Sequence, residues 1–508
     1  MKPTRTRAVG IVAGTAVFGV IAALATPANA ATAIDTSTLR QAVTGERIQQ
    51  HLEEFQAIAD VNGANRAAGT EGHVQSAEYV EEQLAASGYE TTRQYFEYDK
   101  TVFTAAVLDQ VAPTPTSYAL FDEFYPMDYS GEGDVTAPLT AVDVNLEGDR
   151  ASTSGCEAAD FTGFPEGHIA LIQRGTCPFS DKATNAEAAG ATGVVVFNQG
   201  DDLAGDDRFG VVYGTLGAFG VGIPVVGTSF AIGEALVGAD HPELRLALDV
   251  EIEHVETFNV LADTGGRTDR TVVVGGHLDS VAEGPGINDN GSGTATILET
   301  ALRIAELETD PVNRIRFAFW SGEEDGLIGS DYYVSQLSKR DLKDTAVNLN
   351  FDMTGSPNAV RFVYDGDGDA FGTSGPNGSG VVEDVFLDYF ASQGLPVEAT
   401  DFDGRSDYFG FIENGIPAGG LFTGAEGIKT AEQAAVFGGT AGEAYDPCYH
   451  SLCDTVDNVD PVVLEQMADA VAHATLTFGM TSSAVNGTDK GSRGGADALT
   501  LKGSKLIV

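Results

Sequence analysis

Four segments of the chain carry histidine or carboxylate side chains in places that could form one site. Three of them directly follow apolar, strand-like runs, and the fourth lies in a loop further along the chain. His277 follows TVVVGG, the pair Glu323 and Glu324 follows RIRFAFW, Asp352 follows AVNLNF, and His450 lies in CYHSLC. Imidazole and carboxylate groups without cysteine form a ligand set that zinc accepts readily. In open α/β sheets, ligands bind beyond the carboxyl ends of the strands. We therefore expect these side chains to converge on a metal site that hydrolyses its substrate.

Each of these residues taken alone has an ordinary structural explanation. A histidine at a strand end is often a hydrogen-bonding core residue, an aspartate after a strand is often a cap, and paired glutamates at a turn are usually solvated. Four such segments at one edge of a sheet are harder to explain by structure alone, and this coincidence favours the metal site.

Asp289 lies in the glycine-rich loop GPGINDNGSG that follows His277. Two histidines and three carboxylates exceed the needs of one zinc ion, but they suit two ions that share a bridging carboxylate. Asp289 is the natural bridge, because glycine lets the backbone bring its side chain between the two metals. Glu323 is not needed as a ligand and can take the proton from metal-bound water. The charges of two Zn²⁺ ions would be balanced by Asp289, Glu324, Asp352 and a bridging hydroxide. An ionised Glu323 then makes the pocket net negative, which favours a cationic substrate group such as a free α-amine.

The elements that must position these residues alternate between strand and helix patterns. From about residue 251, the runs TVVVGG, RIRFAFW, AVNLNFDM and IPAGGLFT read as strands, and GTATILETALRIAEL and VEDVFLDYFASQG read as helices. This alternation predicts an α/β fold, a mostly parallel mixed sheet with helices on both faces. Before it, RIQQHLEEFQAIAD and SAEYVEEQLAASGY read as helices, with Ser76 as the cap of the second helix and Gly88 as its end, and TTRQYFEY reads as a strand.

A smaller unit with a different pattern interrupts the larger one. After the break at PTPTSY, the runs GHIALIQRGTCPF, DKATNAEAAGATGVVVFN and GIPVVGTSF predict a β-rich α/β domain that carries no catalytic constellation. We expect residues 118–250 to form this inserted domain and residues 31–117 and 251–480 to form the two parts of the catalytic domain. The polar stretch 481–508 is expected to be a flexible tail.

The first thirty residues have the pattern of a secretory signal peptide. Basic residues precede the apolar run AVGIVAGTAVFGVIAALA, and Ala28-Asn29-Ala30 forms an A-x-A cleavage site. The alternative is an uncleaved membrane anchor. No other stretch is apolar enough to span a bilayer, so we expect a secreted, extracellular protein.

The charge and the cysteines agree with an exported protein. A formal net charge of −47 would repel nucleic acid and anionic membranes. The chain has four cysteines, Cys156, Cys177, Cys448 and Cys453. In an exported protein this even number favours two disulfides between neighbours in sequence, although three pairings are open. The alternative of a zinc–cysteine site lacks the spacing of a zinc ribbon.

Five motifs in this order, GGHLDS, GINDNGSG, SGEEDGLIGS, NFDM and YHSLCD, carry a resemblance to a known family. In order and spacing they resemble the secreted bacterial dizinc aminopeptidases (the leucyl aminopeptidase and aminopeptidase Y type). NGANRAAGTEGHVQSAEYV and GRSDYFGFIENGIPAGGLFTGA extend the resemblance over almost all of the chain that follows the signal sequence. The middle unit resembles a protease-associated (PA) domain through GHIALIQRGTCPFSDKATNAEAAGATGVVVFN.

The resemblance implies two Zn²⁺ per chain and a role for each matching residue. One ion would be held by His277 and Asp352, the other by Glu324 and His450, and Asp289 would bridge them. Glu323 would act as the general base that takes a proton from metal-bound water and so supplies the attacking hydroxide. The resemblance also implies that Tyr449 hydrogen-bonds the scissile carbonyl as it becomes an oxyanion, that Asp279 orients His277, that Met353, Gly404, Arg405 and Phe422 line a pocket for large apolar residues, and that Cys156–Cys177 and Cys448–Cys453 are disulfides.

We therefore expect a secreted zinc aminopeptidase that hydrolyses the N-terminal peptide bond of peptides and proteins, with a preference for Leu-like N-terminal residues. Its partners would be substrates with a free N-terminus, without nucleic acid or membrane, and the protein is expected to be a monomer. One alternative is a carboxypeptidase or another amide hydrolase on the same scaffold, for which Arg405 is the only nearby carboxylate-binding candidate. The other is a noncatalytic binding protein, although such relatives typically lose ligands or the base, and all are present here.

Overall fold

The computed structural model describes residues 34–148, 150–200, 208–482 and 485. The expected signal peptide at residues 1–30 and most of the expected tail at 481–508 lie outside these described residues. None of the helices within the described ranges combines the length and the apolar character that crossing a membrane requires.

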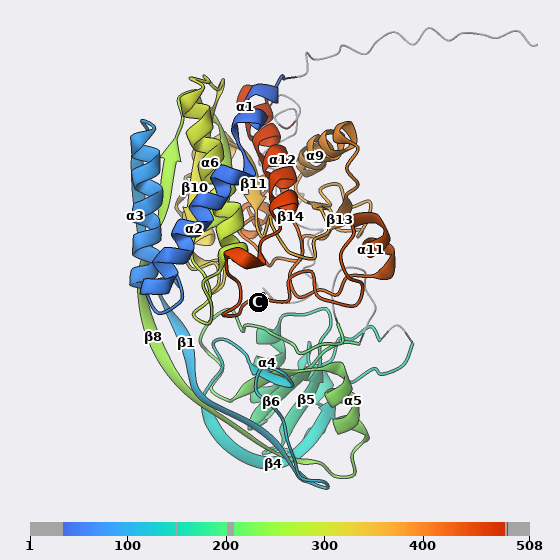
Figure 1. Cartoon of the computed structure of the whole chain (residues 1–508). Coiled ribbons are helices and arrows are strands. Elements are labelled where there is room, and N and C mark those ends of the chain that lie inside the picture. The colour runs from blue at the N-terminus through green and yellow to red at the C-terminus, as the bar shows by residue number, and fades with distance from the viewer. Residues whose placement is uncertain (1–33, 149, 201–207, 483–484, 486–508) are drawn as a thin grey trace, which may run out of the picture. The chain divides into compact units, whose positions relative to one another are not determined.

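The region around the candidate ligands is built on a mostly parallel mixed sheet (Figure 1). Its strands run in the order β13-β12-β14-β11-β9-β10-β8, and β1 pairs along β8. The pairs β10–β9, β9–β11, β11–β14 and β12–β13 are parallel, whereas β8–β10, β12–β14 and β1–β8 are antiparallel. The bounds are β1 Thr91–Ala112, β8 Glu243–Asp263, β9 Arg267–His277, β10 Asn313–Trp320, β11 Thr345–Phe351, β12 Phe362–Tyr364, β13 Glu398–Thr400 and β14 Ala418–Phe422. The expected mostly parallel mixed sheet is confirmed.

Helices cover both faces of this sheet. Successive residues of a strand point to opposite faces, and in β9 the Cα of Gly275 faces the indole of Trp320, whereas that of Gly276 faces Ile297 of α6. The Trp320 ring packs against the rings of Tyr333 in α7 and Phe411 in α10. Helices α6 (Gly293–Glu306) and α12 (Pro461–Met480) pack together over β9 and β10 on one side, and α7 (Ile328–Gln336) and α10 (Phe409–Glu413) cover the other.

The remaining helices of this part of the chain complete the two layers. They are α1 Ser37–Ala42, α2 Gly45–Val61, α3 Glu71–Ala86, α8 Lys339–Asp344, α9 Ser379–Gln393 and α11 Ala431–Phe437. In Figure 1, α2 lies beside α6 and α12, with which it is in contact. Helix α9 packs on β14 and α12, and α8 packs on β9 and β11.

The start of α3 differs from the expectation. Thr70 caps the helix by accepting a hydrogen bond from the backbone N–H of His73 at 3.3 Å, and Gly88 follows the end of the helix with a positive φ of 90°. Ser76 lies inside the helix, where its hydroxyl donates to the carbonyl of Gly72 at 2.8 Å. The prediction of Ser76 as the cap is therefore wrong. A serine hydroxyl can bond either a helix-starting amide or a carbonyl one turn back, so residue type alone did not decide between them.

The long strands β1 and β8 continue into the inserted unit. The expected strand TTRQYFEY ends at residue 98, but β1 runs on to Ala112 because it pairs with β8 almost residue by residue. β4 then pairs with β8 and extends the sheet through β5, β6, β7 and β3. The elements of this unit are β2 Thr116–Ser117, β3 Phe124–Pro126, β4 Gly133–Val142, η1 Ala158–Phe161, β5 Ile169–Gln173, α4 Phe179–Ala188, β6 Gly193–Phe197, β7 Val225–Thr228 and α5 Phe230–Gly238.

The inserted unit has its own buried core on each face of its strands. One face packs α4 residues such as Phe179 and Ala183 against Val194 of β6, and the other packs Phe230 and Leu236 of α5 against Phe197. The disulfide Cys156–Cys177 lies in this unit, and Cys448–Cys453 lies in the catalytic part.

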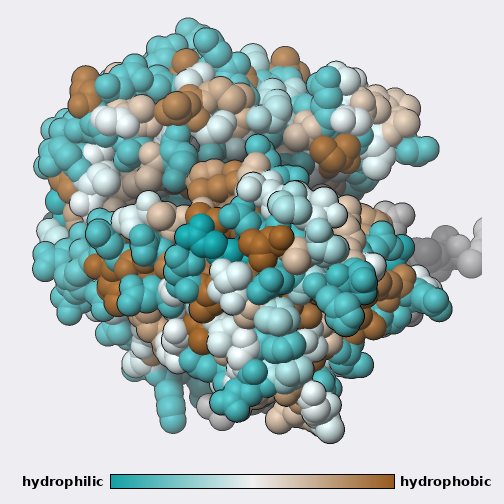
Figure 2. All heavy atoms as spheres, turned by 90° about the horizontal axis from the view of Figure 1, so that it is seen from below, coloured by the Kyte–Doolittle hydropathy of each residue, from teal (hydrophilic) through white to brown (hydrophobic). Residues whose placement is uncertain are grey.

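The surface agrees with the strongly acidic composition of 75 Asp and Glu residues against 28 Lys and Arg. Hydrophilic residues cover most of the face drawn in Figure 2, and hydrophobic side chains lie between them as separate groups.

Candidate metal centre

Three neighbouring strands end side by side at the candidate site. β9 lies between β10 and β11, parallel to both, and its last residue His277 is opposite Trp320, the last residue of β10. Glu323 and Glu324 follow β10, and Asp352 follows β11. Because parallel strands present their carboxyl ends at one edge of a sheet, these side chains meet there. Nε2 of His277 lies 3.4 Å from Oδ1 of Asp352.

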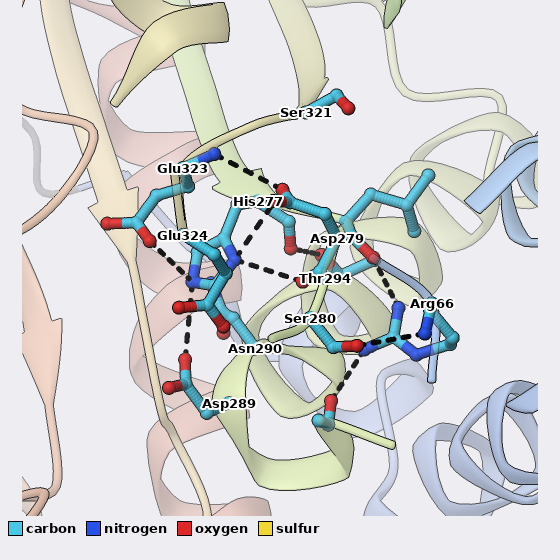
Figure 3. A network of polar contacts seen from close by, with 12 residues as sticks. Arg66, His277, Asp279, Ser280, Asp289, Asn290, Thr294, Ser321, Glu323 and Glu324 are labelled. Carbon is cyan, nitrogen blue, oxygen red and sulfur yellow. Dashed lines mark hydrogen bonds and ion pairs between the residues drawn. The ribbon is translucent and has the colours of Figure 1, made fainter. Parts of the chain in front are cut away.

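Asp289 returns to His277 through the loop that follows β9. It lies in the buried segment η2 (Ile287–Ser292), which leads directly into α6. Gly286 opens this segment with a positive φ of 61°, and a Cβ there would meet the carbonyl oxygen of Asp289 at 2.4 Å, so only glycine fits. The Thr294 hydroxyl donates to the carbonyl of His277 at 2.5 Å, which ties the start of α6 to the end of β9 (Figure 3).

His450 reaches the same point from a loop far along the chain, between α11 and η3 (Val456–Asn458). The disulfide Cys448–Cys453 closes this loop, and His450 adopts a left-handed conformation with φ of 53°. Its Nε2 lies 3.1 Å from Oδ2 of Asp289 and 3.1 Å from Oε2 of Glu324.

The two carboxylate oxygens of Asp289 face different histidines. Oδ1 lies 3.3 Å from Nε2 of His277, and Oδ2 lies 3.1 Å from Nε2 of His450. Zinc bonds to nitrogen and oxygen are about 2.0–2.2 Å, so ligand atoms around a tetrahedral ion lie about 3.3 Å apart. The spacings of 3.1–3.4 Å among these atoms are close to that value.

Buried atoms without hydrogen-bond partners give an independent test of this fit. Oδ1 of Asp352, Oε1 of Glu324 and Nε2 of His450 are buried, and within the described part of the chain none of them has a hydrogen-bond partner. A buried polar atom without a partner costs about 1–3 kcal/mol, and these three converge on the same small region. The donor set of imidazole nitrogen and carboxylate oxygen fits zinc.

The charges at the site are also those of a cation-binding centre. Burial lowers the pKa of His450, but the carboxylates of Glu324 and Asp289 outweigh burial and raise this pKa to about 10. Burial raises the pKa of Glu324 to about 7, although His450 opposes the change. Without a bound cation, protons on the histidines therefore balance the crowded carboxylates.

Comparison with known proteins identifies the family. The profile of peptidase family M28 matches residues 259–475, and the PA domain profile matches residues 135–236. An aminopeptidase of Pseudomonas aeruginosa is 45% identical over 456 residues, which cover 88% of this chain and 83% of that protein. The chain belongs to peptidase family M28. Leucine aminopeptidase 2 of Arthroderma otae is 38% identical over 420 residues, 82% of this chain and 80% of that relative.

Solved structures of other aminopeptidases have the same fold as this M28 peptidase. The aminopeptidase from Aneurinibacillus sp. strain AM-1 has a TM-score of 0.67 at 26% identity and covers 87% of this chain and 95% of its own. BSAP, a zinc aminopeptidase from Bacillus subtilis, has a TM-score of 0.57 at 27% identity, with 85% and 94% covered. The expected family, the α/β fold with an inserted PA domain and the enzyme class, a metallo-aminopeptidase that hydrolyses peptide bonds, are therefore confirmed. The boundaries 118–250 of the insertion stay a prediction, as do the site residues.

Glu323 of this M28 peptidase lies beside the candidate ligands. One of its oxygens, Oε2, is 3.8 Å from Nε2 of His277, and His277, Glu323 and Asp352 form one cluster in which a ligand atom of each lies within 4.8 Å of the others. Burial raises the pKa of Glu323 well above its usual range, and His277 opposes the rise. A carboxylate with a raised proton affinity beside the metal centre is suited to accept a proton there.

Tyr449 and Arg405 meet at the side of the site where His450 enters. The Tyr449 ring stacks on the ring of His450 with centroids 3.9 Å apart, and an Arg405 Nη2 proton points to the phenol oxygen at 3.5 Å. Another nitrogen of Arg405 donates to Glu426 at 2.8 Å. The guanidinium therefore has its own carboxylate partner and is not free to receive that of a substrate.

The other expected pocket residues lie on neighbouring segments. Met353, buried and with a positive φ of 44°, directly follows Asp352. Gly404 has a φ of 88° and donates its N–H to the Tyr408 hydroxyl at 2.8 Å. Phe422, the last residue of β14, stacks on Phe362 of β12 with centroids 6.0 Å apart.

Asp279 meets the ring of His277 with its backbone carbonyl at hydrogen-bond distance and with its carboxylate at ion-pair distance. Nδ1 of His277 lies 3.1 Å from the carbonyl oxygen of Asp279 and 3.9 Å from its carboxylate (Figure 3). The carboxylate also accepts the backbone N–H of Glu323 at 3.4 Å. A carbonyl acceptor holds the ring with its Nε2 toward the metal centre, as the carboxylate was expected to do.

Sequence reasoning missed Ser406. Its hydroxyl donates to Oδ2 of Asp352 at 2.6 Å and accepts a hydrogen bond from Nδ2 of Asn350 at 2.7 Å. This leaves only Oδ1 of Asp352 free to face His277. Ser406 directly follows Arg405 in the sequence GRSD, but a lone serine gives no signal of such a contact.

Asp454, after the disulfide loop, was also missed. Its two oxygens accept the backbone N–H groups of Asn288 at 2.9 Å and Asp289 at 3.0 Å. Asn458 donates to Asp454 at 3.1 Å and to the second buried aspartate, Asp446, at 2.9 Å. Burial raises the pKa of Asp454 to about 7, helped by Asp446. This network joins the segment that carries Asp289 to the loop that carries His450.

Proposed function

We propose that this protein is a secreted aminopeptidase with two zinc ions that releases N-terminal residues from peptides and proteins, with a preference for large apolar, Leu-like residues. The observation that carries the proposal is that the two carboxylate oxygens of Asp289 face different histidines. Oδ1 lies 3.3 Å from Nε2 of His277, and Oδ2 lies 3.1 Å from Nε2 of His450. One ion would be held by His277, Asp352 and Asp289, and the other by His450, Glu324 and Asp289.

The protein's own groups have distinct tasks in this proposal. Zinc ions in the two positions would lower the pKa of water and polarise the scissile carbonyl. Glu323 takes the proton of the attacking water and passes it to the leaving amine. Tyr449 donates its phenol proton as a hydrogen bond to the carbonyl oxygen as negative charge develops there. Arg405, which donates to the phenol oxygen at 3.5 Å, orients the phenol.

The charge of the site favours a free amino group over a free carboxylate. Glu323 and Asp352 lie in one cluster with His277, and Arg405 is already paired with Glu426 at 2.8 Å. A carboxypeptidase needs an unpaired cation for the C-terminal carboxylate of its substrate. Among the described residues Arg405 was the only candidate, and this pairing argues against it.

Two features support export. The first thirty residues have the pattern of a signal peptide. Both disulfides, Cys156–Cys177 and Cys448–Cys453, suit an oxidising compartment.

Hydrolysis of a leucine chromogenic amide tests the activity. Chelation with EDTA should abolish it, and zinc should restore it. A substrate with an acetylated N-terminus should remain intact, because it lacks the amine. Turnover that persists in chelator, or cleavage of the blocked substrate at the same rate, would contradict the proposal.

Glu323→Gln tests the base separately. The variant should bind zinc as the parent protein does and lose turnover by several orders of magnitude. Retained turnover would mean that another group moves the proton.

A further inference from the structure

A buried arginine lies behind the metal centre and has no role in the proposed function. Arg66 belongs to NGANRAAGTEG, in the turn between α2 and α3, far from every candidate ligand in sequence. It is fully buried, and its guanidinium lies over the ring of Phe55 at 5.1 Å. Figure 3 shows it beside the loop that runs from His277 to Asp289.

All side-chain hydrogen bonds of Arg66 go to carbonyls of this one loop. Nε donates to the carbonyl of Pro285 at 2.9 Å, Nη2 to that of Gly286 at 2.5 Å, and Nη1 to that of Leu278. The backbone N–H of Arg66 also donates to the hydroxyl of Ser280 at 2.9 Å.

The acceptors lie at the two ends of the loop. Leu278 directly follows the candidate ligand His277, and Gly286 lies shortly before the candidate bridge Asp289. One rigid, planar guanidinium therefore spans the loop where it leaves the first ligand and where it returns to the second. Lysine could not do this, because its donors share a single nitrogen atom.

The charge of Arg66 is not used in an ion pair. Within the described ranges, no carboxylate lies at ion-pair distance from it, and its nearest acidic neighbours, including Asp279 and Asp454, act only at longer range. Burying a cation without a counter-ion is costly, and here the cost is offset by three carbonyl acceptors. Tertiary packing alone would need only an apolar side chain at this position.

We propose that Arg66 is a positioning residue that sets the separation of His277 and Asp289. By holding the carbonyls of Leu278 and Gly286 on one guanidinium, it keeps the two ligand atoms 3.3 Å apart before any metal binds. The inference rests on the proposed function only in taking these two side chains as zinc ligands.

The test compares Arg66→Met and Arg66→Lys with a matched control. Arg361 is also a buried arginine of the catalytic part, donates from Nε to the carbonyl of Pro396 at 2.9 Å and lies over the ring of Phe437 at 5.2 Å. Among the described residues, none of its hydrogen bonds or ring contacts reaches the 278–286 loop. Arg361→Met therefore removes the same kind of group without touching the 278–286 loop.

Two measurements on the full-length protein decide the matter. The first is hydrogen–deuterium exchange of residues 278–289 in the metal-free protein, which should become faster in Arg66→Met and keep its rate in Arg361→Met. The second is zinc affinity by competition with a chelator, which should fall by about 10–100-fold in Arg66→Met, the range typical for groups that orient metal ligands. Arg66→Lys should lie between Arg66→Met and the parent protein, and Arg361→Met should match the parent.

Unchanged exchange in 278–289 together with unchanged zinc affinity in Arg66→Met would overturn the proposal. Equal losses in Arg66→Met and Arg361→Met would also overturn it, because Arg66 would then act only through overall stability. If Arg66→Met does not fold, Arg66→Lys decides: weaker zinc binding with local loosening supports the proposal, and parent-like values overturn it. If the parent protein binds no zinc at this site, the proposed function is wrong. The exchange rates of residues 278–289 would still test whether Arg66 holds the loop in place.

Discussion

The hydroxyl of Ser406 donates a hydrogen bond of 2.6 Å to Oδ2 of Asp352. The other oxygen of Asp352 lies 3.4 Å from Nε2 of His277 and has no hydrogen-bond partner among the described residues. Ser406 thereby selects which oxygen of Asp352 faces the metal centre.

Ser406→Ala should weaken zinc binding and turnover, because Oδ2 of Asp352 would then be buried without a donor and the carboxylate could rotate. We expect zinc affinity to fall by about 10-fold or more. Ser406→Thr keeps the hydroxyl and is the matched control. Zinc affinity measured by chelator competition checks the prediction, and equal values for the two variants would count against it.

Asp454→Asn should disturb the bridge without touching a ligand side chain. The amide can accept through only one oxygen, so one of the backbone N–H groups of Asn288 and Asp289 loses its acceptor. We expect zinc affinity to fall by about 10–100-fold.

Asp460→Asn is the control for Asp454→Asn. Asp460 caps α12 by accepting the N–H groups of Val462 and Val463. Because asparagine caps helices about as well as aspartate, this variant should keep both its thermal stability and its zinc affinity. Zinc affinity that is equal in the two variants would show that Asp454 does not hold the bridge.

Tyr449→Phe removes the proposed hydrogen-bond donor to the developing oxyanion. The ring can still stack on His450, so the fold should persist. Removing one such donor typically lowers kcat by about 10²–10³-fold, and KM should change much less because the interaction strengthens only in the transition state. Steady-state kinetics on a leucine amide separates the two constants. A change confined to KM would assign Tyr449 to ground-state binding.

Zinc uptake by the metal-free protein should release protons. The pKa of His450 in that state is about 10, so the ring is protonated at neutral pH, and zinc needs the neutral imidazole. Each displaced proton makes the apparent zinc affinity rise about tenfold per pH unit up to that pKa, and Glu324 adds to the release only below its pKa of about 7. Calorimetry at pH 8 in buffers of different ionisation enthalpy measures the release. His450→Gln should release about one proton fewer, and buffer-independent heats in the parent protein would contradict the assignment.

The convergence of the candidate ligands was predictable because it follows from strand order and motif. His277, Glu324 and Asp352 each follow an apolar strand, and parallel strands bring such residues to one edge whatever the details of packing. Asp289 and His450 could be named as candidates from the sequence, but their pairing with particular partners needed the resemblance to a known family, since nothing in a glycine-rich loop or a disulfide loop says where it will fold back.

The supporting contacts were not predictable for a physical reason. Ser406 and Arg66 act through single hydrogen bonds to groups distant in sequence, and a polar residue has the same appearance whether it meets a ligand, a carbonyl or water. The same ambiguity misled the assignment of Ser76, whose hydroxyl bonds a carbonyl inside α3. The length of β1 likewise depended on its partner β8 and not on its own pattern.

The central claim is that Asp289 joins two zinc ions, and anomalous diffraction at the zinc edge from crystals of the zinc-loaded protein tests it most directly. We expect two peaks, one about 2.0–2.2 Å from His277 Nε2 and Asp289 Oδ1 and the other at the same distance from His450 Nε2 and Asp289 Oδ2. A single peak, or peaks that leave either oxygen of Asp289 without a metal, would contradict it.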